Sequence, residues 1–339
     1  MSQQNTNILP TGRRQNRIIH LRAFAWNLIA IGNQIGFKLS PRGWCYQLEG
    51  LGYISKGEFD RVQRLINECR ENGFLPLDFV AEEEARAFTC VNIPTRSPPN
   101  IFLAKQLERL NFLERWYEPD YWDNESHYIQ MLVEKIDLVT LFQDVCCRYH
   151  VPIATSKGWS SVTQRAEIIS RFKIAEDRGQ IPVLLYCGDL DPWGVAISDL
   201  LSEHLDKLSR TTGWTTRNLI IDRFGLNIEL VEEYNLSWID NLETGSGKKA
   251  DRSNPIVQRY IEQFGERKVE ANAIVVIPEE ARSLCVSAIE KYAGSEVLDR
   301  FTEKELQLEI SFQKLRDHID FELYSKAAIE SLEKISGDV

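Results

Sequence analysis

The sequence predicts an α/β protein in which a helical N-terminal module precedes a mostly parallel sheet. From about residue 127, short apolar runs alternate with longer segments of helical periodicity, which is the order of β-α-β units. Before that point, the first 73 residues contain one segment of helical periodicity and two further segments with helix start and stop signals. A third observation concerns chemistry, because two of the apolar runs end in carboxylates.

Composition sets the broad class of the chain. Its 339 residues are enough for two domains, and 43% hydrophobic and 27% charged residues are typical of a soluble globular protein. There is no run of about eighteen apolar residues, so no membrane span is expected, and the polar start lacks the apolar core of a secretory signal. Seven cysteines without a C-x-x-C pair favour reduced thiols in a cytoplasmic setting and speak against a zinc site.

Charge is distributed unevenly along the chain. The net charge is −10, yet residues 1–70 contain ten Lys and Arg against four acids. A basic end on an acidic body is typical of proteins that bind nucleic acid through that end. The alternative is a helical surface that is rich in arginine for no functional reason.

The N-terminal module is expected to contain three helices, over residues 14–35, 41–49 and 55–71. The first has apolar residues at helical spacing. Ser40 followed by Pro41 is a start signal for the second, because serine caps a helix and proline suits its first position. Glycines follow the second and third helices and stop them.

A polar, strand-like tail over residues 77–91 follows these helices. Three short helices and such a tail match a helix-turn-helix or winged-helix module, which binds DNA. An unrelated helical bundle is the alternative. We place this domain at residues 1–95, a linker that contains Ser97-Pro98-Pro99 at 96–125, and the sheet domain with a helical C-terminal region at 126–339.

The sheet domain begins with three predicted strands separated by helices. The spacing predicts strands over 127–133, 151–155 and 182–187, and helices over 138–149 and 162–176. Helices of this length between strands imply a Rossmann-like parallel sheet. The last forty residues are a charged amphipathic helical region, which suits packing or a dimer surface better than chemistry.

Three carboxylates follow predicted strands directly. Glu134 follows the first strand, and Asp189 and Asp191 follow the third. Parallel strands place their carboxyl ends at one edge of the sheet, where open α/β sheets hold their ligands. Two negative charges ~4 Å apart repel by about 4 kcal/mol at an effective dielectric of 20, which a divalent cation removes. Oxygen ligands suit Mg²⁺; the alternative is that each acid caps a helix or faces solvent.

Order and spacing of these residues resemble a known family. The chain contains Val133-Glu134-Lys135, then Ser156-Lys-Gly-Trp-Ser-Ser-Val-Thr-Gln-Arg165, then Gly188-Asp-Leu-Asp-Pro-Trp-Gly194. This resembles the Toprim pattern of topoisomerases, primases and related nucleases, and more closely the A subunit of topoisomerase VI and its meiotic double-strand-break relatives. The resemblance covers roughly residues 15–200. It implies a winged-helix domain followed by a Toprim domain, with Glu134, Asp189 and Asp191 as Mg²⁺ ligands and Lys157 and Arg165 as softer candidates for phosphate contact.

The same family has a nucleophilic tyrosine four residues after an arginine in its winged-helix domain. Here Arg42-Gly-Trp-Cys-Tyr46 has that spacing. A phenol with a pKa of about 10 is scarcely ionised at neutral pH, so it needs help to attack a phosphodiester. Arg42 lies one helical turn before Tyr46, so both can project from one face and the arginine can hold the phosphate. The alternative is that Tyr46 is an aromatic residue that anchors its helix.

The resemblance implies Mg²⁺-dependent cleavage of double-stranded DNA through a 5′-phosphotyrosyl link. It also implies a homodimer, in which the tyrosine of one protomer works with the metal of the other, and a nucleoid-associated location. Only about fifteen residues precede the first helix, whereas the topoisomerase VI A subunit docks its ATPase subunit through an N-terminal extension. The chain is therefore closer to the stand-alone proteins called Mini-A, and an ATPase subunit acting in trans stays open. Two alternatives are a hydrolytic Toprim nuclease that uses metal-activated water and a non-catalytic winged-helix DNA-binding protein.

Overall fold

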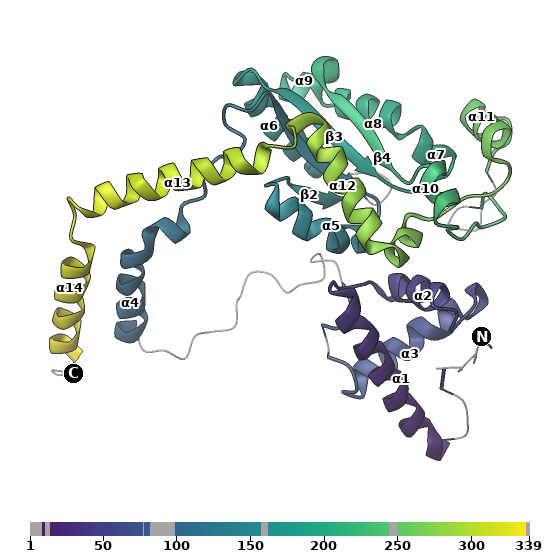
Figure 1. The fold of residues 1–339 in the computed structure, drawn as a ribbon, viewed down its shortest axis with the longest axis horizontal. Helices are drawn as coiled ribbons and strands as arrows, with labels where there is room; N and C mark the ends of the chain where they lie inside the picture. Colours follow the sequence, from purple (N-terminus) through teal and green to yellow (C-terminus); the bar gives the residue numbers. More distant parts are fainter. Residues whose placement is uncertain are drawn as a thin grey trace. The chain divides into compact units, whose positions relative to one another are not determined.

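A sheet of four parallel strands organises the part of the chain that the structure describes (Figure 1). The computed structural model describes residues 9–10, 14–76, 78–81, 99–156, 162–243 and 250–336. Within these ranges the strand order is β2-β1-β3-β4. The strands are β1 (His127–Val133), β2 (Ile153–Thr155), β3 (Ile181–Cys187) and β4 (Ile220–Gly225). The predicted α/β class with a parallel sheet is confirmed, and β4 is a strand that the sequence pattern did not indicate.

Strand register places the carboxyl ends of β1 and β3 side by side. Val133 pairs with Cys187 along the β1–β3 ladder. The residues that follow these strands, Glu134 and Gly188, therefore start at the same edge of the sheet. Cys187 also pairs with Gly225 at the end of β4, so three strands finish at this edge.

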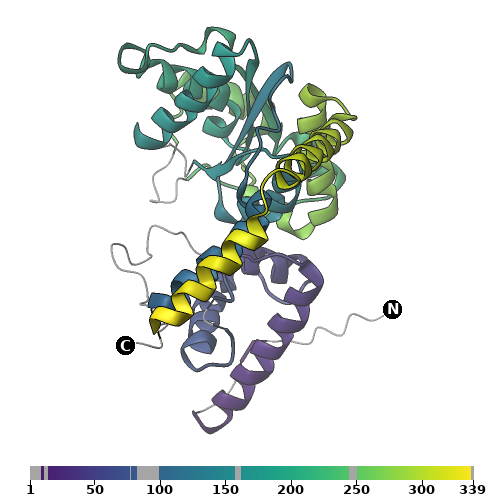
Figure 2. The same cartoon turned by 90° about the vertical axis from the view of Figure 1, so that its left-hand side faces the viewer.

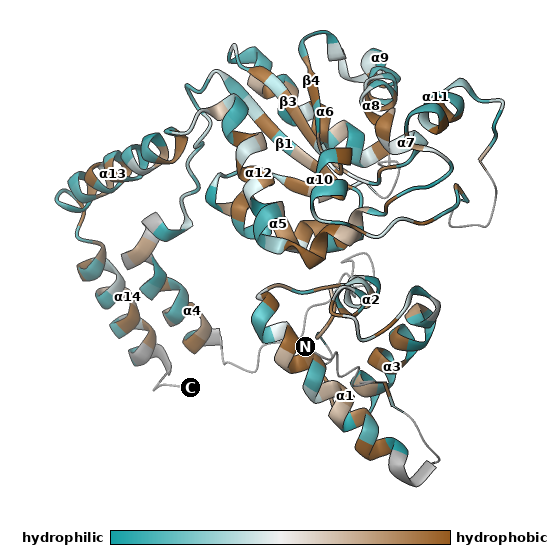
Figure 3. Cartoon of the chain, turned by 45° about the vertical axis from the view of Figure 1, so that its right-hand side comes forward, coloured by the Kyte–Doolittle hydropathy of each residue, from teal (hydrophilic) through white to brown (hydrophobic). Residues whose placement is uncertain are grey.

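Helices cover both faces of the sheet. Alternate residues of a strand point to opposite faces. On one face, α6 (Val162–Asp177) and α8 (Ile197–Asp206) pack over Leu132 and Leu184. On the other face lie α5 (Ile136–Arg148) and α12 (Pro278–Ala293), with Cys146 of α5 in contact with Met131. The hydrophobic strands are thus enclosed between amphipathic helices (Figure 3).

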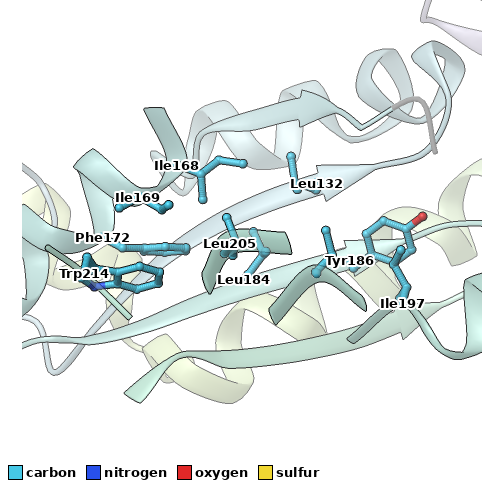
Figure 4. Close-up of a cluster of buried hydrophobic side chains, with 10 residues drawn as sticks. Leu132, Ile168, Ile169, Phe172, Leu184, Tyr186, Ile197, Leu205 and Trp214 are labelled. Carbon is cyan, nitrogen blue, oxygen red and sulfur yellow. The ribbon is translucent and has the colours of Figure 1, made fainter. Parts of the chain in front are cut away.

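The core under α6 is continuous from one end of the sheet to the other. Phe172 stacks on Trp214 with ring centroids 6.0 Å apart, and Tyr186 lies at the opposite end of the cluster (Figure 4). Removing each such side chain from water stabilises the fold by roughly 1.5–3 kcal/mol. This packing fixes β3, and with it the residues that follow β3.

The remaining elements of this body are short and connect the sheet to its helices. They are α7 (Pro192–Val195), α9 (Ser209–Thr212), η4 (Thr216–Asn218), α10 (Ile228–Glu233), α11 (Pro255–Phe264) and η5 (Ala271–Val276).

The N-terminal module consists of α1 (Arg14–Ile35), α2 (Pro41–Gly50), η1 (Lys56–Glu58) and α3 (Phe59–Glu71). The helices occur where the start and stop signals predict them. At the start of α2, the Ser40 side chain accepts a hydrogen bond from the Gly43 amide at 3.1 Å, which is the expected cap. Most of the strand-like tail over 77–91 lies outside the described residues, so the wing of a winged helix is not seen.

The module packs directly on the α/β body through α2. Asp137, at the start of α5, accepts hydrogen bonds from the Ser40 amide and, at 2.6 Å, from the Ser40 hydroxyl. A Cβ atom on Gly43 would lie 2.5 Å from Oδ1 of Asp137, so only glycine allows this approach. Farther along α2, the helix packs on η5. These contacts fix the orientation of α2 on the body.

The chain divides into two compact units, and the elements above belong to the first, Met1–Glu83 with Asn124–Gly294. The second unit is Glu84–Asp123 with Ser295–Val339. It contains α4 (Pro99–Glu108), η3 (Arg109–Trp116), α13 (Val297–Arg316) and α14 (Phe321–Ser336).

Helices far apart in the sequence meet within the second unit. There, α14 lies beside α4 (Figure 2). Phe301 of α13 packs against Trp122, and Lys304 donates hydrogen bonds to the carbonyls of Tyr121 and Asp123 at 2.7 and 2.6 Å. The segment expected as a linker thus supplies helices to a unit that it shares with the C-terminal region.

No helix among the described residues is both long and apolar enough to cross a membrane. The six cysteines in the described ranges are free thiols.

Candidate functional site

The carboxylates that follow β1 and β3 meet at the edge of the sheet. The Asp189 amide donates a hydrogen bond to Oε2 of Glu134 at 2.8 Å. The Glu134 amide in turn donates to the Cys187 carbonyl at 3.0 Å, which extends the ladder by one residue. The expected proximity of Glu134 and Asp189 is therefore observed, and backbone hydrogen bonds hold it in place.

A lysine ammonium lies between these two carboxylates. Nζ of Lys135 is 2.7 Å from Oε1 of Glu134 and 3.0 Å from Oδ2 of Asp189. Burial alone would raise the pKa of Glu134, but Lys135 and the Asp189 amide hold that pKa below its usual range. Glu134 is therefore ionised at neutral pH, and Lys135 supplies the positive charge that two adjacent carboxylates require.

Asp189 is the more deeply enclosed acid. Its Oδ1 accepts a hydrogen bond from the Ala271 amide at 2.7 Å. Burial raises the pKa of Asp189 to about 7, although Lys135 opposes the shift. The Asp189 carboxyl thus changes its charge near neutral pH, so its ionisation responds to whatever cation lies beside it.

Asp191 has a structural task in addition to its place at the edge. It is the N-cap of α7, and its Oδ1 accepts a hydrogen bond from the Gly194 amide at 2.6 Å. A Cβ atom on Gly194 would lie 2.0 Å from the Asp189 carbonyl oxygen, so the turn requires glycine there. The helix-capping alternative considered for the acids therefore holds for one oxygen of Asp191.

A buried arginine donates hydrogen bonds to the backbone of the turn that carries Asp189 and Asp191. Arg223 of β4 donates to the Gly194 carbonyl at 2.9 Å, to the Asp189 carbonyl at 3.1 Å and to the Leu226 carbonyl. These carbonyls satisfy a guanidinium whose burial lowers its pKa. Arg223 thereby fixes the backbone that carries Asp189 and Asp191.

The donor set at this edge has the chemistry that a hard divalent cation prefers. Glu134, Asp189 and Asp191 all offer carboxylate oxygens, and two of them already share one cation, the ammonium of Lys135. Among the described residues, no three His, Cys, Asp or Glu side chains are arranged as a ready ligand set. The residues fit Mg²⁺ by chemistry, and the Lys135 ammonium lies between two of the three carboxylates.

Arg42 and Tyr46 of α2 converge on one carboxylate, that of Glu270. The Arg42 guanidinium donates to both oxygens of Glu270, from Nη2 at 2.8 Å and from Nε at 2.9 Å. The Tyr46 hydroxyl donates to Oε2 of Glu270 at 2.7 Å. The two residues thus share a face of α2, as their spacing predicts.

The Tyr46 phenol is buried and keeps its proton at neutral pH. Its ring packs edge-on against Phe59, and the hydroxyl reaches Glu270. Burial, with Glu270 adding to it, raises the pKa of Tyr46 above its usual value. A cavity of about 330 Å³ between α2, the segment that follows α10, and η5 includes Tyr46 in its wall.

Glu270 and Ala271 connect the two halves of the candidate site within one chain. The Glu270 side chain binds Arg42 and Tyr46, and the next amide, that of Ala271, binds Asp189. The family resemblance implies a meeting between protomers. In the single chain, the tyrosine is already tied to the acidic edge of its own body.

Of the two softer candidates for phosphate contact, Arg165 is not part of this arrangement. Nη1 of Arg165, on α6, donates to the His204 carbonyl of α8 at 2.8 Å, which makes Arg165 a tie between helices. Lys157 lies outside the described residues. Glu270, Ala271 and Arg223 were missed from the sequence, since none of them lies in a recognisable motif.

Comparisons of the chain with protein-family models, with curated proteins and with solved structures find no match. The residues and their geometry therefore carry the functional argument by themselves.

Proposed function

We propose that this chain is a Mg²⁺-dependent DNA-cleaving enzyme in which Tyr46 attacks a phosphodiester. It would resemble the topoisomerase VI A subunit, with a winged-helix module, a Toprim body and, in its active form, a homodimer bound to double-stranded DNA in the nucleoid. The observation that carries the proposal is the Glu270–Ala271 segment, which brings the Arg42–Tyr46 pair and the carboxylate edge together.

Each residue has a role that follows from its chemistry. Arg42 presents a planar fork of donors that suits the two free oxygens of a phosphodiester. Tyr46 Oη forms a bond to phosphorus while the bond to the 3′ oxygen breaks, which leaves a 5′-phosphotyrosyl link and a free 3′-hydroxyl. The phenolic proton leaves as that bond forms, and the departing 3′ oxygen takes up a proton.

Glu134, Asp189 and Asp191 would hold the cation at the sheet edge. Mg²⁺ there would neutralise the acidic edge and stabilise charge on the phosphate oxygens. Lys135 and Arg223 hold Glu134, Asp189 and the turn in their positions. The basic N-terminal module supplies sequence-independent attraction for the DNA backbone.

An adduct assay tests the proposal. Wild-type protein incubated with supercoiled plasmid and MgCl₂, then denatured with detergent, is expected to leave protein covalently attached to 5′ DNA ends. Tyr46→Phe and Asp189→Ala should form no adduct, whereas Tyr53→Phe, a tyrosine just after α2, should behave as wild type. Adduct formation by Tyr46→Phe at the wild-type level would rule out Tyr46 as the nucleophile.

One observation favours a second candidate, a hydrolytic nuclease. The Tyr46 hydroxyl is held by Glu270 and its pKa is raised, so in this state the phenol is a weak nucleophile. A water molecule activated at the carboxylate edge could cleave DNA instead. In that case Tyr46→Phe retains cleavage without any adduct, and Asp189→Ala abolishes it.

A further inference from the structure

Glu270 occupies the position on Arg42 that the proposed substrate needs. An arginine fork binds carboxylates and phosphates in the same bidentate manner. Here Nε and Nη2 of Arg42 are both engaged by the Glu270 oxygens, at 2.9 and 2.8 Å. A phosphodiester cannot take the same two donors while Glu270 holds them.

The contact between Glu270 and Tyr46 also occupies a position that the proposed substrate needs. Oε2 of Glu270 accepts a hydrogen bond from the phenol at 2.7 Å and also one from Nε of Arg42. One carboxylate oxygen therefore bridges the proposed nucleophile and the proposed phosphate anchor. That is where a phosphate oxygen would lie if Arg42 held the group that Tyr46 attacks.

If Glu270 were a general base for Tyr46, its carboxylate would lie in the same position. The direction of the pKa shifts of Tyr46 and Glu270 distinguishes a base from a competitor of the substrate. Burial and the Glu270 charge raise the pKa of Tyr46. For Glu270, burial alone would raise the pKa, but the Tyr46 hydrogen bond and Arg42 hold it below its usual range. The two pKa values move apart, which keeps the proton on the phenol. Efficient base catalysis needs the opposite shift in the carboxylate.

We propose that Arg42 and Tyr46 form a phosphodiester-binding subsite that Glu270 fills in the DNA-free chain. The Glu270 carboxylate acts as an internal stand-in for the phosphate, and DNA must displace it before Tyr46 can react. This inference rests on the proposed function, since it takes the phosphate anchor to be Arg42. Glu270 is accordingly a competitor of the substrate.

Accessibility agrees with this role. The Glu270 side chain is 16% exposed and that of Arg42 is 46% exposed, so an anion can approach the Arg42 side chain from solvent. Glu270 lies just before the short helix η5, and its side chain binds α2 through Arg42 and Tyr46. Exchange of the carboxylate for a phosphate therefore breaks these side-chain contacts.

Salt-dependent DNA binding tests the inference without any cleavage. Binding of a labelled 20-base-pair duplex is measured by fluorescence anisotropy in EDTA over a series of salt concentrations. Each phosphate contact adds about 0.9 to the slope of log K against log salt. Glu270→Gln frees Arg42 for one phosphate, so the slope should steepen by about 0.9, and affinity at 0.1 M salt should rise by about eightfold.

Matched variants separate this effect from a general change of charge. Glu266→Gln removes the same charge four residues earlier, where its partner is Arg252 rather than Arg42, and should leave the slope unchanged. The double variant Glu270→Gln with Arg42→Gln should lose both the steeper slope and the higher affinity. Glu270→Ala gives a second removal of the carboxylate, and thermal unfolding confirms that each variant is folded.

The outcomes distinguish failure of the inference from failure of the proposed function. A slope for Glu270→Gln equal to that of wild type, or a gain that survives Arg42→Gln, overturns the inference. So does loss of the covalent adduct in Glu270→Gln with unchanged DNA affinity, because that result makes Glu270 a base. The absence of an adduct in wild type with a steeper slope in Glu270→Gln removes the tyrosine mechanism but supports the subsite.

Discussion

Lys135 offers the sharpest test of the carboxylate edge, because its ammonium is the only cation that a described contact places against both Glu134 and Asp189. Lys135→Met keeps the length of the side chain and removes the charge. Glu134 then loses the contact that holds its pKa low, and breaking a charged hydrogen bond of this kind costs about 1.5–3 kcal/mol. This loss is present at every pH where Glu134 is ionised.

Asp189 adds a pH-dependent contribution to the stability that is lost in Lys135→Met. Its pKa is about 7 in the folded chain and about 3.9 in an unfolded one, so wild-type stability falls as the pH rises through that interval and then levels off. Without Lys135 the folded pKa lies higher, and stability continues to fall above pH 7 by up to about 1.36 kcal/mol per pH unit. The difference from wild type should be about 1.5–3 kcal/mol at pH 6 and up to about 3.5–5 kcal/mol at pH 8.5.

Urea unfolding in EDTA at the two pH values measures this difference. Lys135→Arg keeps the charge and should lose less stability than Lys135→Met. As a control, Lys173→Met removes a lysine from the surface of α6. MgCl₂ at about ten times the wild-type dissociation constant should stabilise wild type by about 1.4 kcal/mol. The same concentration should stabilise Lys135→Met by more, because without the ammonium the variant binds Mg²⁺ more tightly. Unfolding free energies equal to wild type at pH 8.5 would refute the electrostatic account of this edge.

Two further variants test the packing that positions the site. Gly43→Ala should destabilise by about 1–3 kcal/mol in urea unfolding, since the new Cβ meets Asp137 at 2.5 Å, whereas Gly57→Ala, with open space around it, should not. Phe172→Ala should cost about 3–5 kcal/mol by the same measurement, and Ile174→Ala, on the exposed side of α6, under about 1 kcal/mol; equal losses would mean that the core under α6 does not hold the sheet.

Local patterns were sufficient to predict the carboxylate edge. The apolar runs over 127–133 and 182–187 match β1 and β3 closely, because both strands are buried on both faces and read as continuous hydrophobic stretches. Once the strands are parallel neighbours, the pairing of Val133 with Cys187 brings Glu134 beside Asp189. The spacing of Arg42 and Tyr46 likewise predicted a shared face of one helix.

The rest of the site depends on contacts between distant residues. Glu270 lies 224 residues from Tyr46 and 228 from Arg42, and its own segment has no periodic or motif signal. Strand β4 was missed for a related reason. Asp222 and Arg223 interrupt its apolar character, and Arg223 is tolerated inside only because three backbone carbonyls accept its hydrogen bonds. Tertiary contacts of this kind have no local signature.

The two halves of the candidate site cannot change independently, because adjacent residues hold them. Glu270 binds the Arg42–Tyr46 pair through its side chain, and the following amide, that of Ala271, binds Oδ1 of Asp189. A movement of this peptide that withdraws the Glu270 carboxylate also moves the donor that satisfies Asp189. Any ligand that displaces Glu270 therefore alters the ionisation and the cation affinity of Asp189, and a cation at Asp189 alters the ease of that displacement by the same factor. In the proposed mechanism, phosphate binding at α2 and cation binding at the sheet edge would be parts of one equilibrium.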